Sequence, residues 1–261
     1  MTRPVAVVTG ASRGIGKRFC IDLARHGWDV VATARSSDDS RGKLPGTIDE
    51  TAALARREGA KALAVALDVR DEAAVAKLAD QVYDAFGRCD LVVNNAALAP
   101  PKAALEDSTK RWRLAVDVNV NGPFYFVYYF APRMAKAGGG RIVNISSGAS
   151  QMPDFGRASY TTTKAALEAM TQSLAHDLEK QRVAVNCIRL DLPVWTEGFT
   201  DTLPPDVNIP FEDPVIMSDA LLWFAKQPLD VTGQVLGIVE MREKGHVRPF
   251  TPADRGPERG R

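Results

Sequence analysis

The residues best suited to chemistry lie in the segment SGASQMPDFGRASYTTTK, residues 147–164. It places a hydroxyl at Ser147, a phenol at Tyr160 and an ammonium at Lys164. If the chain is helical from residue 158, the four-residue spacing puts Tyr160 and Lys164 on one helix face. A phenol ionises with a pKa of roughly 10, and a nearby cation favours its ionised form. The three residues therefore predict proton exchange with an alcohol or carbonyl oxygen that Ser147 hydrogen-bonds.

Proton exchange alone oxidises nothing, so this chemistry needs a hydride carrier, and the N-terminal region offers a place to bind one. A short apolar strand, residues 5–8, runs into TGASRGIG, residues 9–16, and an amphipathic helix follows. Glycines at this point let backbone N–H groups and the helix N-terminus approach a pyrophosphate, although their spacing differs from the general dinucleotide fingerprint. A plain tight turn would explain the glycines alone. The strand before them and the helix after them favour dinucleotide binding.

The second expected strand, residues 29–34, ends in ATARSS, without the Asp or Glu that an NAD site usually carries. Arg35 follows this strand, and Arg13 lies inside the glycine turn, so two cations can flank a 2′-phosphate. The pattern predicts a preference for NADP(H) over NAD(H). The alternative is that both arginines are solvated surface residues.

The elements that must position these groups alternate between strands and helices along the rest of the chain. Apolar strands are expected to end at Asp68-Val69, in NNAA (residues 94–97), in NISS (residues 144–147), and within RVAVNCIRL and GQVLGIVE. One long helix is expected over residues 109–136, with Asn119 inside it, and an interruption of this helix near Gly122 and Pro123 would expose a backbone carbonyl or an asparagine to the site. Continuous apolar strands between helices are typical of a parallel sheet covered on both faces. The aromatic run at residues 124–130 favours core packing plus a subunit interface.

Length and composition limit the class of protein. A chain of 261 residues suits one α/β domain, and a net charge of +1 argues against a nucleic-acid partner. No stretch approaches the roughly 18 apolar residues of a membrane span, and no signal-peptide region is evident, so a cytoplasmic protein is expected. The cysteines Cys20, Cys89 and Cys187 lie far apart and lack metal-ligand spacing, so no metal site is expected.

A long Pro- and aromatic-rich loop, residues 190–213, follows the sixth strand. Loops of this length are commonly lids or binding loops, so we expect the substrate between this loop and the sheet edge. The expected pocket walls are Trp195, Phe199 and Phe211 on the loop, with Met152 and Phe155 opposite. Residues 1–241 are expected to form the dinucleotide-binding domain that includes this loop, and residues 242–261 a polar, partly disordered tail.

Several of these motifs occur in a fixed order along the chain: the glycine turn, Asp68-Val69, NNAA, the helix asparagine, NISS and YTTTK. The short-chain dehydrogenase/reductase family carries such motifs in the same order, and the chain resembles that family over about residues 4–240. The resemblance implies a single-domain, doubly wound Rossmann fold with a seven-stranded parallel sheet. It also implies a nicotinamide dinucleotide, a small-molecule carbonyl or alcohol substrate, and a homodimer or homotetramer.

The resemblance also implies residue roles. Tyr160 matches the general acid/base, Ser147 the residue that positions the substrate oxygen, and Lys164 the residue that favours ionisation of the phenol and binds the nicotinamide ribose. Asn119 matches a residue that holds a proton-relay water. The implied cofactor contacts are Gly10, Ser12, Arg13, Gly14, Ile15, Gly16, Asp68, Val69, Asn95, Ala96, Val194 and Thr196, in addition to Arg35, Tyr160 and Lys164.

One departure concerns the sixth strand, where RLDLPVWTEGF has Leu190 and Asp191 nearest the family's usual Pro-Gly, with one residue more before Val194 and Thr196. The longer loop with KLPGTI, near residue 45, is similar to that of hydroxysteroid dehydrogenase-like members. We predict reversible hydride transfer between NADP(H) and a secondary alcohol or ketone; a 3-oxoacyl thioester, a steroid-like ketone and a small diketone stay open as substrates. The alternatives are a non-catalytic dinucleotide-binding sensor or scaffold, or a lyase or epimerase of the extended relatives.

Overall fold

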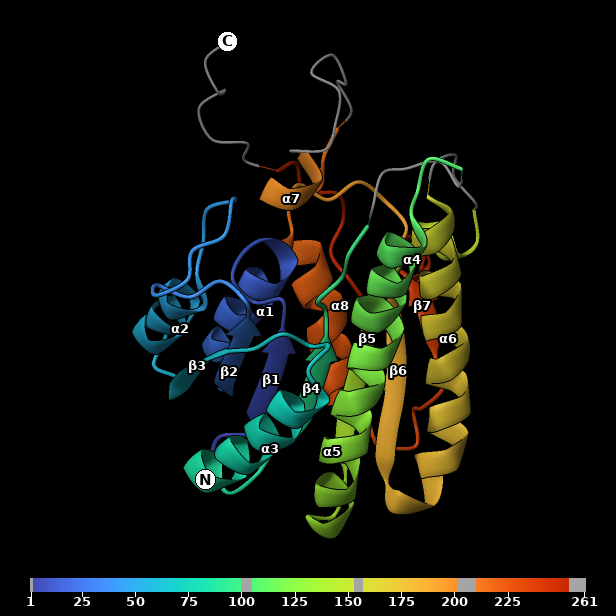
Figure 1. The fold of residues 1–261 in the computed structure, drawn as a ribbon. Helices are drawn as coiled ribbons and strands as arrows, with labels where there is room; N and C mark the ends of the chain where they lie inside the picture. The colour runs from blue at the N-terminus through green and yellow to red at the C-terminus, as the bar shows by residue number, and fades with distance from the viewer. Residues whose placement is uncertain (1, 100–104, 153–156, 201–209, 254–261) are drawn as a thin grey trace.

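Seven strands of the described chain pair in parallel to form one sheet. The computed structural model describes residues 2–99, 105–152, 157–200 and 210–253. The strands are β1 (Val5–Thr9), β2 (Asp29–Ala34), β3 (Ala62–Ala66), β4 (Leu91–Asn94), β5 (Gly140–Ser147), β6 (Val183–Leu190) and β7 (Val235–Gly237). Their order is β3-β2-β1-β4-β5-β6-β7, so the direction of winding reverses between β1 and β4 (Figure 1). This confirms the predicted doubly wound α/β fold, whose ligands bind at such a reversal.

Helices cover both faces of this sheet. They are α1 (Gly14–Arg25), α2 (Ile48–Arg57), α3 (Glu72–Phe86), α4 (Thr109–Val116), α5 (Gly122–Lys136), α6 (Ala158–Leu178), α7 (Glu197–Thr200), α8 (Val215–Lys226) and α9 (Ile238–Glu243). Figure 1 shows α3, α5 and α6 on one face, and α1, α2 and α8 on the other. Each face buries its own apolar cluster, with Phe19 and Phe224 in one and Phe126 and Phe130 in the other. The strands are apolar on both faces because each face is covered.

The single helix expected over residues 109–136 is interrupted. Residues Asp117–Asn121 form a π-helical turn between α4 and α5, and the N–H of Gly122 donates to the carbonyl of Asp117. Such turns insert an extra residue into a helix and recur at functional sites. Here the extra residue lets Asn119 turn into the interior, where it is 1% exposed. Residue periodicity did not predict the turn, because its cause is a contact with another segment.

The last strand is also shorter than expected, because GQVLGIVE is a strand only over Val235–Gly237 and α9 follows at once. The carboxylate of Asp191 accepts a hydrogen bond of 3.1 Å from the N–H of Val239, in the first turn of α9. A Cβ on Gly237 would lie 2.1 Å from Asp191 Oδ2, so the glycine makes room for this carboxylate. The departure from Pro-Gly after β6 therefore gives the chain an acid that holds the start of α9.

Residues 242–253, at the start of the expected tail, pack on the domain. Val247 is buried, the ring of His246 stacks on Trp223 at 4.4 Å, and Arg248 pairs with Asp219. The N–H of Ala253 donates to the carbonyl of Phe211, so this segment also holds the far end of the long loop. Residues 254–261 lie outside the described residues. In the part of the chain that is described, no helix has the length and apolar character to cross a membrane.

Candidate active site

A cavity of about 370 Å³ opens at the carboxyl end of the sheet, beside the reversal between β1 and β4. The segments around it are the glycine turn, the ends of β2 and β4, the residues after β3, the π-helical turn and the start of α7. Its lining is Gly10, Ser12, Arg13, Gly14, Ile15, Gly16, Ala34, Arg35, Ser36, Leu44, Leu67, Asp68, Val69, Asn95, Ala96, Ala97, Leu98, Leu114, Val118, Thr196 and Gly198. Nearly all of the predicted cofactor contacts therefore meet at one cavity.

The glycine turn brings main chain close to this cavity. Gly10 has φ of 65°, in the left-handed region that favours glycine, and a Cβ there would lie 2.9 Å from Ala96 Cα. A Cβ on Gly16 would lie 2.3 Å from the carbonyl oxygen of Gly10. Only glycines allow this approach, and α1 begins directly at Gly14. The backbone N–H groups and the positive end of a helix thus lie at the cavity wall, where the glycines add no side chains, and such a wall suits an anion.

A carboxylate already contacts this helix N-terminus. Glu197 Oε2 accepts a hydrogen bond of 3.1 Å from the N–H of Gly14, and so links α7 to α1. A phosphate that uses the same N–H has to replace this carboxylate. The sequence analysis did not single out Glu197, because the contact joins segments far apart in the chain.

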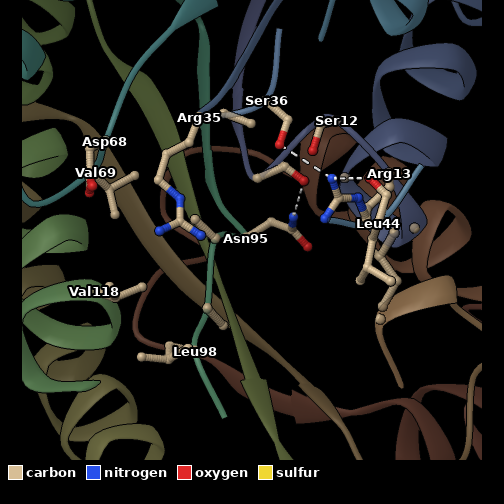
Figure 2. A pocket seen from close by; sticks show the side chains of 18 of the residues that line it. Ser12, Arg13, Arg35, Ser36, Leu44, Asp68, Val69, Asn95, Leu98 and Val118 are labelled. Carbon is tan, nitrogen blue, oxygen red and sulfur yellow. Dashed lines mark hydrogen bonds between the residues drawn. The ribbon is translucent and has the colours of Figure 1, made fainter. Parts of the chain in front are cut away.

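Two arginines supply positive charge to the cavity (Figure 2). Arg13 donates to the carbonyls of Pro45 and Leu44 at 2.9 and 3.0 Å, and to Ser36 Oγ at 3.3 Å. The loop with KLPG is thereby fastened over the glycine turn, and Gly46, with φ of 99°, lets it come within contact of Ser12. In Figure 2 the exposed side chain of Arg35 extends into the pocket. Ser36 and Leu44 are cavity residues that the motif search missed.

Asp68 and Val69 line the cavity after β3. The Arg70 guanidinium binds both carboxylate oxygens of Asp68, at 2.6 to 3.1 Å. These hydrogen bonds, assisted by the nearby charge of Arg35, hold the pKa of Asp68 below its ordinary value against the opposing effect of burial. Asp68 is therefore an ionised, oriented acceptor at the cavity wall.

The paired asparagines after β4 tie neighbouring strands together. Asn95 Nδ2 donates to the carbonyls of Thr9 and Gly10, at 2.9 and 3.3 Å. Asn94 Nδ2 donates to Asn144 Oδ1 at 2.8 Å, across to β5. Asn95 is thus both a lining residue of the cavity and a link between β1 and β4.

The predicted proton-transfer residues lie on β5 and α6 and do not line this cavity. Ser147 ends β5, and its Oγ accepts a hydrogen bond of 3.3 Å from the N–H of Ala149. Lys164 is 3% exposed, and its Nζ donates to the carbonyl of Ile145 at 2.6 Å. The same Nζ lies 5.6 Å from the centroid of the Tyr160 ring. The structure therefore joins phenol and ammonium on one helix face, next to the strand that carries the serine.

The side chain of Asn119 is fully engaged with protein groups. Its Oδ1 accepts from the N–H of Leu98, and its Nδ2 donates to the Leu98 carbonyl, both at 2.8 Å. Nδ2 also donates to Thr163 Oγ1 at 2.9 Å, on the helix that carries Tyr160. Asn119 thus links a wall of the cavity to α6.

The expected substrate-pocket residues lie in several environments. Phe199 and Phe211 meet edge to face at 6.0 Å, and Phe211 is buried. The main-chain N–H of Trp195 donates a hydrogen bond of 3.0 Å to the carbonyl of Glu212. Met152 is 76% exposed, whereas Phe155 lies outside the described residues.

The two residues of the long loop that were expected to contact the cofactor lie in different environments. Thr196 lines the cavity. Val194 is 3% exposed, packs into the core cluster and forms a bridge with Glu212, so it does not reach the cavity in this structure.

Comparison with known proteins identifies the family of this chain. A family model described as short chain dehydrogenase matches residues 4–198. The (2S)-[(R)-hydroxy(phenyl)methyl]succinyl-CoA dehydrogenase subunit BbsD of Thauera aromatica is 34% identical over 242 residues, which cover 89% of this chain and 93% of that protein. A 3-oxoacyl-[acyl-carrier-protein] reductase of Synechocystis is 34% identical over 188 residues, 72% and 73% of the two chains. Hydroxysteroid dehydrogenase-like protein 2 of Danio rerio is 29% identical, over 93% of this chain and 59% of that protein.

Solved structures with this fold include complexes with either nicotinamide dinucleotide. A metagenomic short-chain oxidoreductase in complex with NADP superposes with a TM-score of 0.75 and 29% identity, over 90% of this chain and 96% of that one. A short chain dehydrogenase from Mycobacterium paratuberculosis bound to NAD gives a TM-score of 0.78 and 28% identity, over 90% and 95%. With its fold, glycine turn and ordered motifs, the chain belongs to the short-chain dehydrogenase/reductase family of oxidoreductases.

Proposed function

We propose that this protein transfers a hydride reversibly between NADP(H) and a secondary alcohol or ketone. The observation that carries the proposal is the buried ammonium of Lys164 beside the Tyr160 ring, on a helix packed along the strand that ends in Ser147. Two relatives support the substrate class by their names, since one name contains a hydroxy(phenyl)methyl group and the other a 3-oxoacyl group. These groups are a secondary alcohol and a ketone.

The residues around the cavity fit a dinucleotide with a 2′-phosphate. The glycines of the turn and the N-terminus of α1 suit the pyrophosphate, and Arg13, Arg35 and Ser36 suit the 2′-phosphate. Asp68 and Val69 would hold the adenine, and Thr196 and Lys164 the nicotinamide end. When bound, the nicotinamide supplies or accepts the hydride.

The chain's own residues then handle the oxygen and its proton. Tyr160 donates a proton to the substrate oxygen in reduction and removes it in oxidation, while Lys164 stabilises the phenolate form. Ser147 donates a hydrogen bond to the same oxygen and orients it. Because the Asn119 side chain is used by Leu98 and Thr163, a relay water would be held by the Asn119 main chain.

We also propose that the substrate is an apolar or aromatic-bearing carbonyl compound and that the protein is a homodimer or homotetramer. The aromatic pair of Phe199 and Phe211 supports the first part. The second is supported by the exposure of Phe124 and Tyr128 on α5, at 43% and 60%, and of Trp112 on α4, at 41%.

The test of cofactor choice is a fluorescence titration with NADPH and, separately, NADH. Wild type is expected to bind NADPH about tenfold more tightly, a difference of ~1.4 kcal/mol. Arg35→Ala should remove most of this preference and leave NADH binding unchanged, because only the 2′-phosphate meets this cation. Arg57→Ala, which removes an exposed cation of α2 outside the cavity, is the matched control.

Turnover is then followed by NADPH absorbance with a 3-oxoacyl thioester, a steroid ketone and a 1,2-diketone. Reduction of at least one of these ketones supports the proposal. Tight NADPH binding without any turnover, in either direction, would favour the non-catalytic sensor instead.

A further inference from the structure

Glu168 lies four residues after Lys164 and eight after Tyr160, on the same face of α6. Its Oε1 accepts hydrogen bonds from Ser146 Oγ at 2.7 Å, Ser150 Oγ at 2.6 Å and Arg189 Nε at 3.0 Å. Its Oε2 accepts from Arg189 Nη2 at 2.7 Å. One carboxylate therefore joins three separate segments to the helix that carries the phenol and the ammonium.

These three segments surround Ser147. Ser146 precedes it on β5, and Ser150 ends the short 3₁₀ helix, Gly148–Ser150, which Ser147 caps. Arg189 pairs with Ser146 across the β5–β6 ladder and directly precedes the long substrate loop. The backbone before Ser147, the backbone after it and the neighbouring strand are thus all fastened to Glu168.

The network is largely withdrawn from solvent and electrically balanced. The side chains of Glu168 and Arg189 are 13% and 12% exposed. Burial alone would raise the pKa of Glu168, but the hydrogen bonds from Arg189, Ser150 and Ser146 outweigh it and keep the pKa below its ordinary value. A buried ion pair of this kind contributes little net stability compared with apolar residues of the same volume, so geometry is the better explanation for its presence. Hydrogen-bonded charges fix direction as well as distance.

We propose that Glu168, together with Arg189, is a positioning residue that fixes the Ser147 hydroxyl relative to Tyr160 and Lys164. The inference rests on the proposed function. It assigns to Glu168 the hydrogen bonds that set the register of α6 on the end of β5. Lys164 makes the neighbouring link in this register through the carbonyl of Ile145. Without Glu168, helix and strand keep that link, while Ser146 and Ser150, on either side of Ser147, lose their hydrogen bonds to α6.

The test compares Glu168→Gln with wild type, using as probe whichever of the three ketones named above wild type reduces fastest. The kcat is expressed per NADPH-binding site, so that loss of folded protein does not count as loss of chemistry. We expect this kcat to fall about 10- to 100-fold, as a misplaced catalytic group does, with the Kd for NADPH changed less than about twofold because the cavity does not include Glu168. Asp177→Asn, an exposed acid on the same helix, is the control and should match wild type.

A purely structural role would lower the melting temperature and the number of binding sites while the kcat per site stayed within about twofold of wild type, and this result overturns the inference. If Glu168→Gln does not fold, Ser150→Ala decides, because it removes one hydrogen bond without stranding Arg189. A fall in its kcat per site of about threefold or more supports the inference, and an unchanged value overturns it. If wild type itself reduces none of the ketones, the proposed function fails and the inference falls with it, whereas inactivity of the variants alone leaves the proposed function intact.

Discussion

At the scale of single residues, the central feature is a lysine that is almost fully buried yet keeps a polar partner. Lys164 donates to the carbonyl of Ile145, which limits the cost of removing its charge from water, and it stays within 5.6 Å of the Tyr160 ring centroid. A buried cation acts on a nearby phenol more strongly than a solvated one, because water screens it less. This arrangement suits proton transfer better than structural support.

The first prediction concerns the phenol itself. Tyr160→Phe keeps the ring, which is neither fully buried nor fully exposed, and removes only the hydroxyl that exchanges the proton. The kcat should fall by about 10²- to 10⁴-fold, while the Kd for NADPH and the melting temperature stay close to those of wild type. Steady-state assays, NADPH titration and thermal unfolding of the same sample measure the three quantities. Activity retained in this variant would rule out Tyr160 as the acid/base.

Residues whose roles depend on local spacing could be predicted from the sequence. The strand, glycines and helix predicted the glycine turn at a ligand site, the family resemblance added Asp68 and Asn95, and all of them line the cavity. Residues whose roles depend on contacts between distant segments could not be predicted. Glu197 meets Gly14 across 183 positions of sequence, and no local pattern marks such a pair.

At the scale of elements, the short helix α7 and the long helix α1 share one electrostatic contact. The N-terminus of α1 carries partial positive charge, and the Glu197 carboxylate satisfies the N–H of Gly14 there. A dinucleotide pyrophosphate competes for the same N–H and is repelled by the same carboxylate. Glu197 therefore links the long loop to the glycine turn at the cavity.

Glu197 should affect the binding of NADPH and NADH alike, whereas Arg35 should affect NADPH binding alone. Glu197→Gln removes the competing charge, so NADPH and NADH should both bind more tightly, by roughly two- to fivefold. Without cofactor the variant should melt slightly below wild type, because α1 loses a favourable charge. Titration with both dinucleotides, and thermal unfolding without them, test the two effects. Glu179→Gln, an exposed glutamate remote from α1, serves as control, and equal affinities in all three proteins would refute this effect of Glu197.

Element boundaries show the same division between local and distant causes. The strands β1 and β2 and the glycine-turn helix follow from apolar runs and small residues, and they were predicted closely. An interruption near Gly122 was considered, but its π-helical form and α9 were missed. Asn119 bonds Leu98 and Thr163 on other segments, and Asp191 reaches α9 only because Gly237 leaves space for it. Periodicity carries no information about such contacts.

At the scale of the whole molecule, residues 242–253 pack against the end of the long loop. The carboxylate of Glu212, 3% exposed, pairs with Arg242 at 2.7 Å and accepts from the N–H of Thr251 at 2.9 Å. Glu212 also bridges to Val194 near the start of the long loop. Arg242 of α9 and Thr251 after it therefore hold Glu212, and through it Val194, in place. Composition predicted a polar tail from residue 242, because polar and Arg-rich segments are usually mobile. The contact that orders Arg242 could not be read from composition, because its buried partner, Glu212, lies 30 positions away.

Removing this arginine should therefore cost much more than removing a surface charge. Arg242→Met leaves the buried Glu212 without its cation, and we expect the free energy of unfolding to fall by about 2–4 kcal/mol, below the full cost of a buried pair because Arg242 is itself 28% exposed. For a chain of this size, each kcal/mol lowers the melting temperature by roughly 2–4 °C. Lys244→Met breaks the neighbouring exposed pair with Glu240 and should change stability by less than about 1 kcal/mol. Adding Glu212→Gln to Arg242→Met should restore part of the loss, since the unpaired charge is then gone. Equal melting temperatures for the two single variants would show that the C-terminal segment does not hold the loop.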